Sequence, residues 1–195
     1  DSILEKKPKK LFLIEKDNAL SELLEEKYKD NNKTEIICED ILEHNFENYK
    51  NIIIISNLPY NISTKVILLL FKFNKNISDM VLMIQKEVAE KFNYNLPKMN
   101  KYKFLTKIVS KFNICFDVSA KVFKPKPKVR SAVVKFEFNN QYVNYIKAQE
   151  FSDIIFKNVR KKISNNLKTK KQDKLLNKRV GELTINELLS IYDFF

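Results

Sequence analysis

Four consecutive residues could together hold a planar base that carries an amino group. Asn57, Leu58, Pro59 and Tyr60 directly follow an apolar run. A residue before proline favours an extended backbone, while proline has a fixed φ and offers only a carbonyl. The segment therefore predicts one stiff turn with a side-chain amide oxygen, a backbone carbonyl and an aromatic ring, which suits an exocyclic amine on a stacked base. The alternative is an ordinary strand-to-helix turn, in which Asn and Pro are common.

Carboxylates follow two earlier apolar runs that we expect to be strands. Glu15 and Asp17 come after the first run, and Glu39 and Asp40 after the second. Ligands of open α/β sheets bind beyond the carboxyl ends of the strands, where an acidic side chain can accept from ribose hydroxyls. Glu15 is therefore a candidate for ribose and Asp40 for an adenine amine. Both pairs could instead be N-caps of the helices that follow.

Three scarce residue types exclude several kinds of site. Gly181 is the only glycine, so these residues can form neither a G-x-G-x-x-G turn nor a Walker A loop. Cys38 and Cys115 each lie in an apolar run, which predicts two buried thiols in a reducing compartment and no metal site. The one histidine, His44, lies in a polar stretch and is expected at the surface, which argues against Ser-His-Asp and His-zinc chemistry.

The charge balance predicts a polyanionic partner. Lys and Arg number 36 against 24 Asp and Glu, a formal net charge of +12. Such an excess favours nucleic acid or an anionic membrane surface, although a solvated lysine-rich surface would have the same composition. No apolar run reaches the ~18 residues of a membrane span, and no signal peptide opens the chain, so we expect no membrane partner. The longest basic stretch is Arg160–Lys174.

The elements that must position these residues alternate between strand and helix. Apolar patterns predict strands near 11–14, 35–38, 52–55, 80–84, 114–118 and 134–138, with helices between them, one of them at 63–73. This order predicts an α/β fold with a largely parallel sheet, helices on both faces and an antiparallel edge. The β-branched run Ile52–Ile55 is expected to be buried on both faces.

Beyond about Gln141 the pattern changes to helices alone. An apolar stripe runs through 151–159, and Thr184 with Glu187 predicts a capping box at the start of a last helix. We therefore expect two domains, at 1–140 and 141–195, of which the second is small and all-helical.

Several segments resemble one family. Asn57–Thr64 (NLPYNIST) resembles motif IV of the ribosomal-RNA adenine N6-dimethyltransferases, the KsgA/RsmA family. Further segments resemble the following blocks of that family in the same order, namely 83–91, 122–134, 156–168 and 179–189. The similarity covers essentially the whole chain, although the family's glycine-rich first motif and the strand before it would lie upstream of Asp1.

The resemblance implies a Rossmann-like class I methyltransferase sheet, without its first strand here, and a small C-terminal helical domain that binds RNA. It implies S-adenosyl-L-methionine as cofactor and transfer of methyl groups to two adjacent adenines of small-subunit ribosomal RNA during ribosome biogenesis. The expected partner is the immature small ribosomal subunit. The expected protein is a monomer in the cytoplasm of a bacterium or in an organelle matrix.

Individual residues match the family's cofactor site. Glu15 matches the ribose-binding acid, and Asp40 with Ile41 beside it matches the residues at the cofactor adenine. Asn57 is expected to belong to the cofactor site as well as to the target-base site. Because no glycine-rich loop is present to hold the methionine end, the 195 residues alone are expected to bind S-adenosyl-L-methionine poorly.

Other residues match the family's target-base and RNA sites. Asn57 and the Leu58–Pro59 backbone match the groups that hold the target amine, and Tyr60 and Phe123 match the aromatics that flank the flipped adenine. The implied phosphate contacts are Lys126, Lys128, Arg130, Arg160, Lys161, Lys162 and Lys168. Arg130 stands where the family often has Asp.

The sequence leaves three other functions open. One is a large-subunit ribosomal RNA adenine methyltransferase of the macrolide-resistance type, a group that usually has Ile where Leu58 stands. Another is a non-catalytic nucleic-acid-binding factor on the same fold, against which the intact Asn57–Tyr60 segment argues. The last is a small-molecule methyltransferase, which the net charge disfavours.

Overall fold

Two compact units make up the chain, Asp1–Phe46 and Glu47–Phe195. The computed structural model describes residues 1–125, 127–138, 143–171 and 173–195. Lys126 and the domain boundary expected between 140 and 141 lie outside the described residues. The C-terminal helices belong to the same unit as the sheet that precedes them, so the two-domain division at 140 stays a prediction.

The first unit contains a short parallel β-sheet. After a 3-10 turn, η1 (Leu4–Lys6), come β1 (Leu11–Glu15), α1 (Asn18–Tyr28) and β2 (Thr34–Cys38). β1 and β2 are parallel and in register from Leu11 opposite Thr34 to Glu15 opposite Cys38. Both predicted strands are confirmed, and their carboxyl ends lie side by side with Glu15 and Glu39 joined by a backbone hydrogen bond of 2.9 Å.

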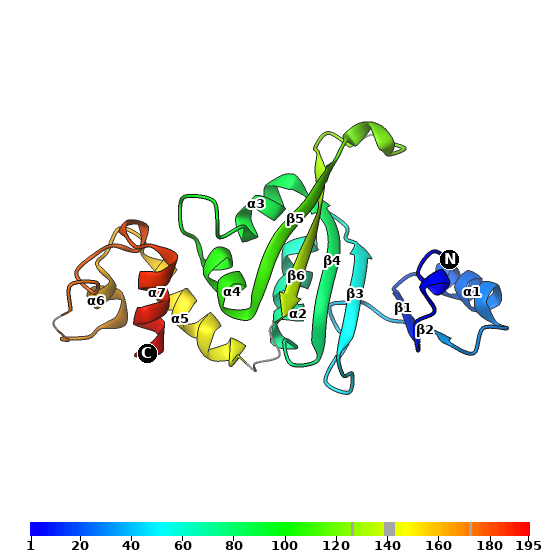
Figure 1. Ribbon diagram of the computed structural model, residues 1–195, viewed down its shortest axis with the longest axis horizontal. Coiled ribbons are helices and arrows are strands. Elements are labelled where there is room, and N and C mark those ends of the chain that lie inside the picture. The colour runs from blue at the N-terminus through cyan, green and yellow to red at the C-terminus, as the bar shows by residue number, and fades with distance from the viewer. Residues whose placement is uncertain (126, 139–142, 172) are drawn as a thin grey trace. The chain divides into compact units, whose positions relative to one another are not determined.

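The second unit contains a four-stranded sheet with the order β3-β4-β6-β5 (Figure 1). Its strands are β3 (Ile52–Asn57), β4 (Ile77–Gln85), β5 (Ser110–Val118) and β6 (Ser131–Phe138). β3 and β4 are parallel, whereas β4–β6 and β6–β5 are antiparallel. The expected antiparallel edge is confirmed, but the expectation of a largely parallel sheet is wrong for this unit because β6 returns from its hairpin and inserts between β5 and β4.

Helices cover one face of this sheet. They are α2 (Ser63–Lys72), α3 (Lys86–Phe92) and α4 (Lys101–Val109). On the covered face, alternate residues of β4 and β6 are fully buried, namely Met80, Leu82, Ile84, Ala132, Val134 and Phe136. Phe71 of α2 packs edge-on against Phe92, Phe136 and Phe138 at ring distances of 5.6 to 6.1 Å. Burial of these aromatic side chains contributes to the stability of the unit.

The opposite face is only partly covered within this unit. Ile53 and Ile55 are 60% and 56% exposed. The expectation that Ile52–Ile55 is buried on both faces is therefore wrong. The reason is that β3 is the edge strand, and only the side chains that alternate with Ile53 and Ile55 lie on the helix-covered face.

The C-terminal helices pack on α4. After β6 come α5 (Tyr145–Lys157), α6 (Ile163–Leu167), the 3-10 turn η3 (Val180–Glu182) and α7 (Ile185–Asp193). Another 3-10 turn, η2 (Ala120–Val122), lies earlier, in the β5–β6 hairpin. The rings of Phe104, Phe151 and Tyr192, from α4, α5 and α7, lie 5.2 to 5.7 Å apart. The predicted capping box of Thr184 and Glu187 is confirmed at the start of α7.

Two further expectations concern the thiols and the membrane. Cys38 and Cys115 are both exposed, so the prediction of buried thiols is wrong. Cys38 ends β2, and Cys115 lies in an irregularity of the edge strand β5 between Ile114 and Phe116. In the described part of the chain, no group of three or more metal-ligating side chains is found. None of the described helices is long and apolar enough to cross a membrane.

Candidate active site

The turn after β3 is built by one backbone hydrogen bond and one buried side chain. β3 ends at Asn57, and the Leu58 N–H donates to the carbonyl of Met83 in β4 at 3.1 Å. The Leu58 side chain is buried in the core, while Asn57 is exposed. The strand ladder and the core therefore fix the backbone on which the Asn57 amide is carried.

The Pro59 carbonyl starts helix α2. It accepts hydrogen bonds from the Ile62 N–H at 3.2 Å, from the Ser63 N–H at 3.1 Å and from the Ser63 hydroxyl at 2.9 Å. The predicted stiff turn is confirmed. Because the Pro59 oxygen already accepts three hydrogen bonds, the Asn57 side chain and the Leu58 carbonyl are the better candidates to accept from a bound amine.

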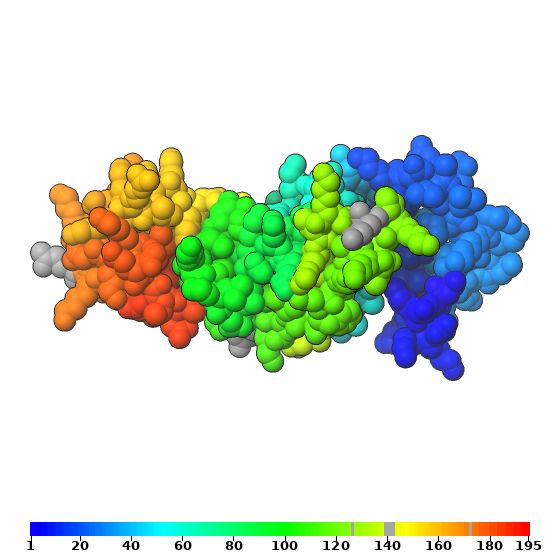
Figure 2. All heavy atoms as spheres, turned by 90° about the horizontal axis from the view of Figure 1, so that it is seen from above, coloured from blue at the N-terminus to red at the C-terminus, as the bar shows by residue number. Residues whose placement is uncertain are grey.

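An open hollow of about 340 Å³ lies beside this turn. Its lining comes from the turn and from the β5–β6 hairpin, namely Asn57, Leu58, Pro59, Tyr60, Phe123, Lys124, Pro125 and Pro127. The volume falls within the range of small-ligand sites, roughly 300–1,000 Å³. The structure thus brings together all five residues expected at a target base. The hairpin stands at the surface of the second unit (Figure 2).

Tyr60 is held by a residue that the sequence did not point to. Its hydroxyl lies 2.9 Å from the hydroxyl of Ser131, which is fully buried at the start of β6. In the sequence, Ser131 belongs only to the family-like block 122–134, and that membership does not indicate a contact with a tyrosine 71 residues away.

Glu15 and Asp17 have different roles at the end of β1. The Glu15 Oε1 atom accepts from the backbone N–H groups of Lys16 at 2.8 Å and Asp17 at 3.0 Å. Asp17 is the N-cap of α1 and accepts from the Leu20 N–H at 3.0 Å. The capping alternative is therefore right for Asp17. Glu15 is not a cap, and in the described residues its Oε2 atom accepts no hydrogen bond.

Asp40 lies at the end of β2 and is held as a charged group. Its Oδ2 atom is 2.6 Å from the Lys16 ammonium, and its Oδ1 atom accepts from the Leu42 N–H at 2.9 Å. The hydrogen bond from Lys16, followed by that from Leu42, lowers the pKa of Asp40 below its usual value. Ile41 beside it is half-buried. Asp40 therefore offers a carboxylate acceptor rather than a helix cap.

His44 is not at the surface as expected. It is only 8% exposed, its Nδ1 atom lies 2.7 Å from a Glu39 carboxylate oxygen, and its ring packs edge-on against Phe46 at 4.7 Å. The Glu39 carboxylate is the hydrogen-bond partner that permits a buried imidazole. The polar residues around His44 in the sequence do not reveal this contact.

The expected site residues fall into two groups in different units. Glu15, Asp40 and Ile41 belong to the first unit, whereas Asn57 and the residues of the hollow belong to the second. The described members of the expected RNA-binding set are all exposed, namely Lys128, Arg130, Arg160, Lys161, Lys162 and Lys168. Lys126 lies outside the described residues.

The basic segment, which we define as residues 160–179, is held by backbone pairing at its two ends. A β-bridge joins Lys162 to Arg179. The N–H groups of Ile163 and Ser164 donate to the backbone carbonyls of Lys178 and Leu176 at 2.9 and 2.8 Å. The segment therefore presents the cations near these ends from a folded backbone.

Known proteins resemble this chain along its length. The family model described as "Ribosomal RNA adenine dimethylase" matches residues 2–195. A ribosomal RNA small subunit methyltransferase A of Malacoplasma penetrans is 38% identical over 82% of this chain and 60% of its own length. The protein of that name from Buchnera aphidicola is 39% identical over 87% of this chain and 68% of its own length. The protein of that name from Hydrogenobaculum is 34% identical over 97% of this chain and 75% of its own length.

Two solved structures share the fold. A dimethyladenosine transferase from Plasmodium falciparum has a TM-score of 0.75 at 20% identity and covers 95% of this chain and 82% of its own. The 23S rRNA methyltransferase ErmE has a TM-score of 0.73 at 17% identity, and the match covers 94% of this chain and 81% of ErmE. At these identities the structures show the α/β methyltransferase fold alone. The matches to the three curated relatives span 60 to 75% of those proteins. The chain belongs to the ribosomal RNA adenine dimethylase family.

Proposed function

We propose that this chain belongs to an enzyme that transfers methyl groups from S-adenosyl-L-methionine to N6 of two adjacent adenines in small-subunit ribosomal RNA. The observation that carries the proposal is the hollow of about 340 Å³, which combines an amide, a backbone turn and two aromatic rings. Family membership and the three relatives that bear the name of small-subunit methyltransferases support it. We propose that the enzyme acts in the cytoplasm or in an organelle matrix, where its ribosomal substrate is assembled.

The end of the β1–β2 sheet fits the adenosine half of the cofactor. The Oε2 atom of Glu15 is available to accept from ribose hydroxyls while Oε1 is held by two backbone N–H groups. Asp40, kept charged by Lys16 and Leu42, fits an adenine amine, with Ile41 against the ring. S-adenosyl-L-methionine, when bound, supplies the electrophilic methyl group.

Asn57 would prepare the target amine for reaction. The nitrogen lone pair of adenine N6 is delocalised into the ring, which makes the amine a poor nucleophile. The Asn57 amide oxygen and the Leu58 carbonyl can each accept one N–H, which favours a pyramidal nitrogen and stabilises its developing positive charge. Correct orientation of the base supplies much of the remaining rate.

Tyr60 and Phe123 would hold the base outside its helix. Removing an adenine from the stack costs a few kcal/mol, and stacking on aromatic side chains returns ~1–3 kcal/mol per base. Both rings line the hollow, Tyr60 from the turn after β3 and Phe123 from the β5–β6 hairpin. The basic segment and the hairpin cations would bind phosphates, the former as part of the helical domain that we propose for 141–195.

Labelled methyl transfer with the full-length protein tests this proposal. Label is expected in N6,N6-dimethyladenosine of undermethylated small ribosomal subunits. Label in naked large-subunit RNA alone would favour the macrolide-resistance activity instead. Absence of label from both substrates, together with retained RNA binding, would leave the non-catalytic nucleic-acid-binding factor.

A further inference from the structure

A hydrogen-bonded pair of hydroxyl groups joins the turn after β3 to the start of β6. The Tyr60 and Ser131 oxygens are 2.9 Å apart, and either can donate. Ser131 is fully buried, whereas the Tyr60 ring is half-buried and lines the hollow. A buried serine hydroxyl needs a hydrogen-bond partner. That partner is the Tyr60 hydroxyl, so the hydrogen bond that satisfies Ser131 also holds one aromatic ring of the site.

The pair spans a strand that lies between its two members. Tyr60 belongs to the turn after β3, and Ser131 opens β6, while β4 separates these strands in the sheet. Ser131 is opposite Gln85 of β4 and Val118 of β5 in the sheet register. Its position is therefore set by neighbours on both sides, which makes it a rigid anchor for Tyr60.

Ser131 also ends the hairpin that supplies part of the lining of the hollow. The hairpin residues Phe123 and Pro127 line the hollow a few positions before Ser131. At the base of this hairpin, the Lys86 N–H donates to the Arg130 carbonyl at 3.0 Å. The hydrogen bond to Ser131 therefore links the Tyr60 ring to the hairpin that carries Phe123.

We propose that Ser131 is a positioning residue for methyl transfer. It holds the Tyr60 ring at the angle at which a flipped adenine can stack between Tyr60 and Phe123. The inference rests on the proposed function and goes beyond it by assigning a role to a residue that does not line the hollow. A phenol ring without this bond can turn about its side-chain torsions, so ordering it at each encounter would cost part of the stacking energy.

Two substitutions remove the same bond from opposite ends. Ser131→Ala deletes the anchor, and Tyr60→Phe deletes the phenol oxygen while keeping the ring. Each is expected to lower kcat about three- to tenfold, as for one lost hydrogen bond, with little change in KM. The double variant is expected to lose no more than either single variant, because both remove one interaction. Reduced quenching of 2-aminopurine placed at the target position should accompany the loss in all three.

A matched control separates positioning from folding. Ser110 is also a buried serine at the start of a strand, and its hydroxyl donates to the Thr106 carbonyl at 3.2 Å, away from the hollow. Ser110→Ala should lower the unfolding midpoint in denaturant while leaving kcat and 2-aminopurine quenching unchanged. If Ser131→Ala does not fold, Tyr60→Phe carries the test, since its side chain is half-buried.

The outcomes distinguish this inference from the function on which it rests. Additive losses in the double variant, or unchanged kcat and quenching in Tyr60→Phe, would overturn the role of Ser131 while wild-type activity stands. Absence of methyl transfer by the wild-type full-length protein would overturn the proposed function itself. Non-additive losses in kcat and quenching, with an unaffected Ser110→Ala control, would support both.

Discussion

At the residue scale, the chemistry that we propose depends on the Asn57 amide, which is carried on a backbone that its neighbours hold in place. The Pro59 carbonyl is used by helix α2, and Leu58 is anchored in the core. Asn57, at the end of β3, is exposed toward the hollow with its backbone fixed. The local structure therefore presents one amide at a defined place, as a preorganised polar group requires.

Replacement of this amide tests its role directly. Asn57→Ala is expected to lower kcat by roughly 10²- to 10³-fold, the usual effect of removing one preorganised hydrogen-bonding group. RNA affinity should be unchanged, because the cations that we propose to bind phosphates lie elsewhere. Methyl-transfer kinetics and an RNA-binding assay on the same preparation measure the two effects. An equal loss of both would contradict the assignment.

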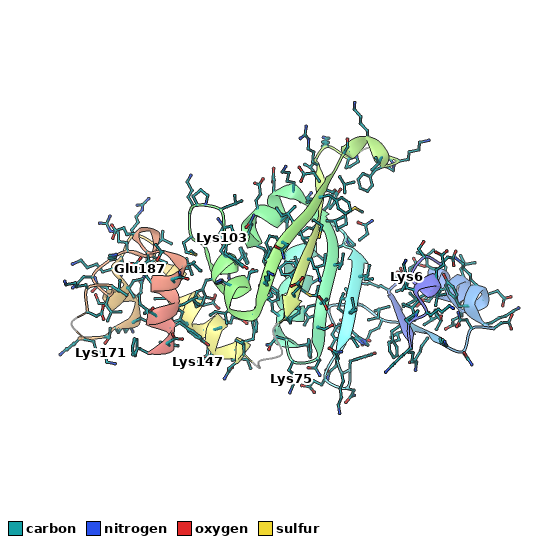
Figure 3. The ribbon with its side chains drawn as sticks, viewed as in Figure 1. Lys6, Lys75, Lys103, Lys147, Lys171 and Glu187 are labelled. Carbon is teal, nitrogen blue, oxygen red and sulfur yellow. The ribbon has the colours of Figure 1, made fainter. Side chains whose placement is uncertain are left out.

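A second residue with an unusual environment is Lys103. It is 4% exposed, and its ammonium donates to the carbonyls of residues 96, 97 and 98 at 2.6 to 3.2 Å (Figure 3). These bonds fix the loop between α3 and α4. Burial lowers the pKa of Lys103 below its usual value, against a smaller opposite effect of Glu90.

Lys103→Met should therefore lower stability and change its dependence on pH. The loss is expected at roughly 1–3 kcal/mol, since three carbonyls lose a charged donor. Between the lowered pKa and 10.5, the unfolded chain binds more protons than the folded one. The contribution of Lys103 to stability thus rises with pH in that window. Denaturant unfolding at several alkaline pH values should show this rise in the wild type relative to the variant.

At the element scale, the cap of α7 connects that helix to the basic segment. Glu187 accepts from the Lys178 ammonium at 2.7 Å, from the Thr184 N–H at 2.8 Å and from the Thr184 hydroxyl at 3.0 Å. The Lys178 bond, followed by the two from Thr184, lowers the pKa of Glu187 to about 2. Lys178 also accepts from the Ile163 N–H through its carbonyl. The Glu187 carboxylate of the capping box therefore also joins α7 to the basic segment through Lys178.

Acid should weaken this connection. The folded pKa of Glu187 is about 2 against an ordinary 4.5, so its contribution to stability is complete above pH 4.5 and is lost as pH falls toward 2. Glu187→Gln is expected to be less stable than wild type at neutral pH, with a difference that shrinks over that range. Lys178→Met should show the same convergence. Thermal unfolding between pH 2 and 7 measures it, and parallel curves would contradict the account.

At the scale of the whole molecule, the excess of positive charge gathers in one segment. Residues 160–179 contain nine Lys and Arg and a single acidic residue, Asp173. This distribution is what a phosphate-binding surface needs, because each neutralised phosphate releases counterions from the RNA.

The salt dependence of RNA binding tests this segment. Changing Lys161 and Lys168 to Gln should reduce the slope of log K against log salt by about 0.7–0.9 for each phosphate that is no longer neutralised. The double change of Lys27 and Lys29 to Gln is the matched control, because both lysines pair with carboxylates of the first unit. An equal reduction of the slope in this control would show that net charge alone accounts for binding.

The sequence by itself determined the features that depend on neighbours along the chain. The stiff turn at Asn57–Tyr60, the N-cap at Asp17 and the capping box at Thr184 were all predictable. Their causes are local, since proline fixes its own backbone and a capping side chain reaches only two or three residues.

Only the tertiary structure decided which distant side chains meet and which strands are edges. It joined Tyr60 to Ser131 and gave the buried His44 ring a half-buried carboxylate partner, Glu39. It also left Cys38 and Ile53 exposed, against the apolar patterns around them. A pattern of residue types records that a side chain is apolar or polar. What covers it depends on sheet order and on packing between elements far apart in the chain, which local propensities do not encode.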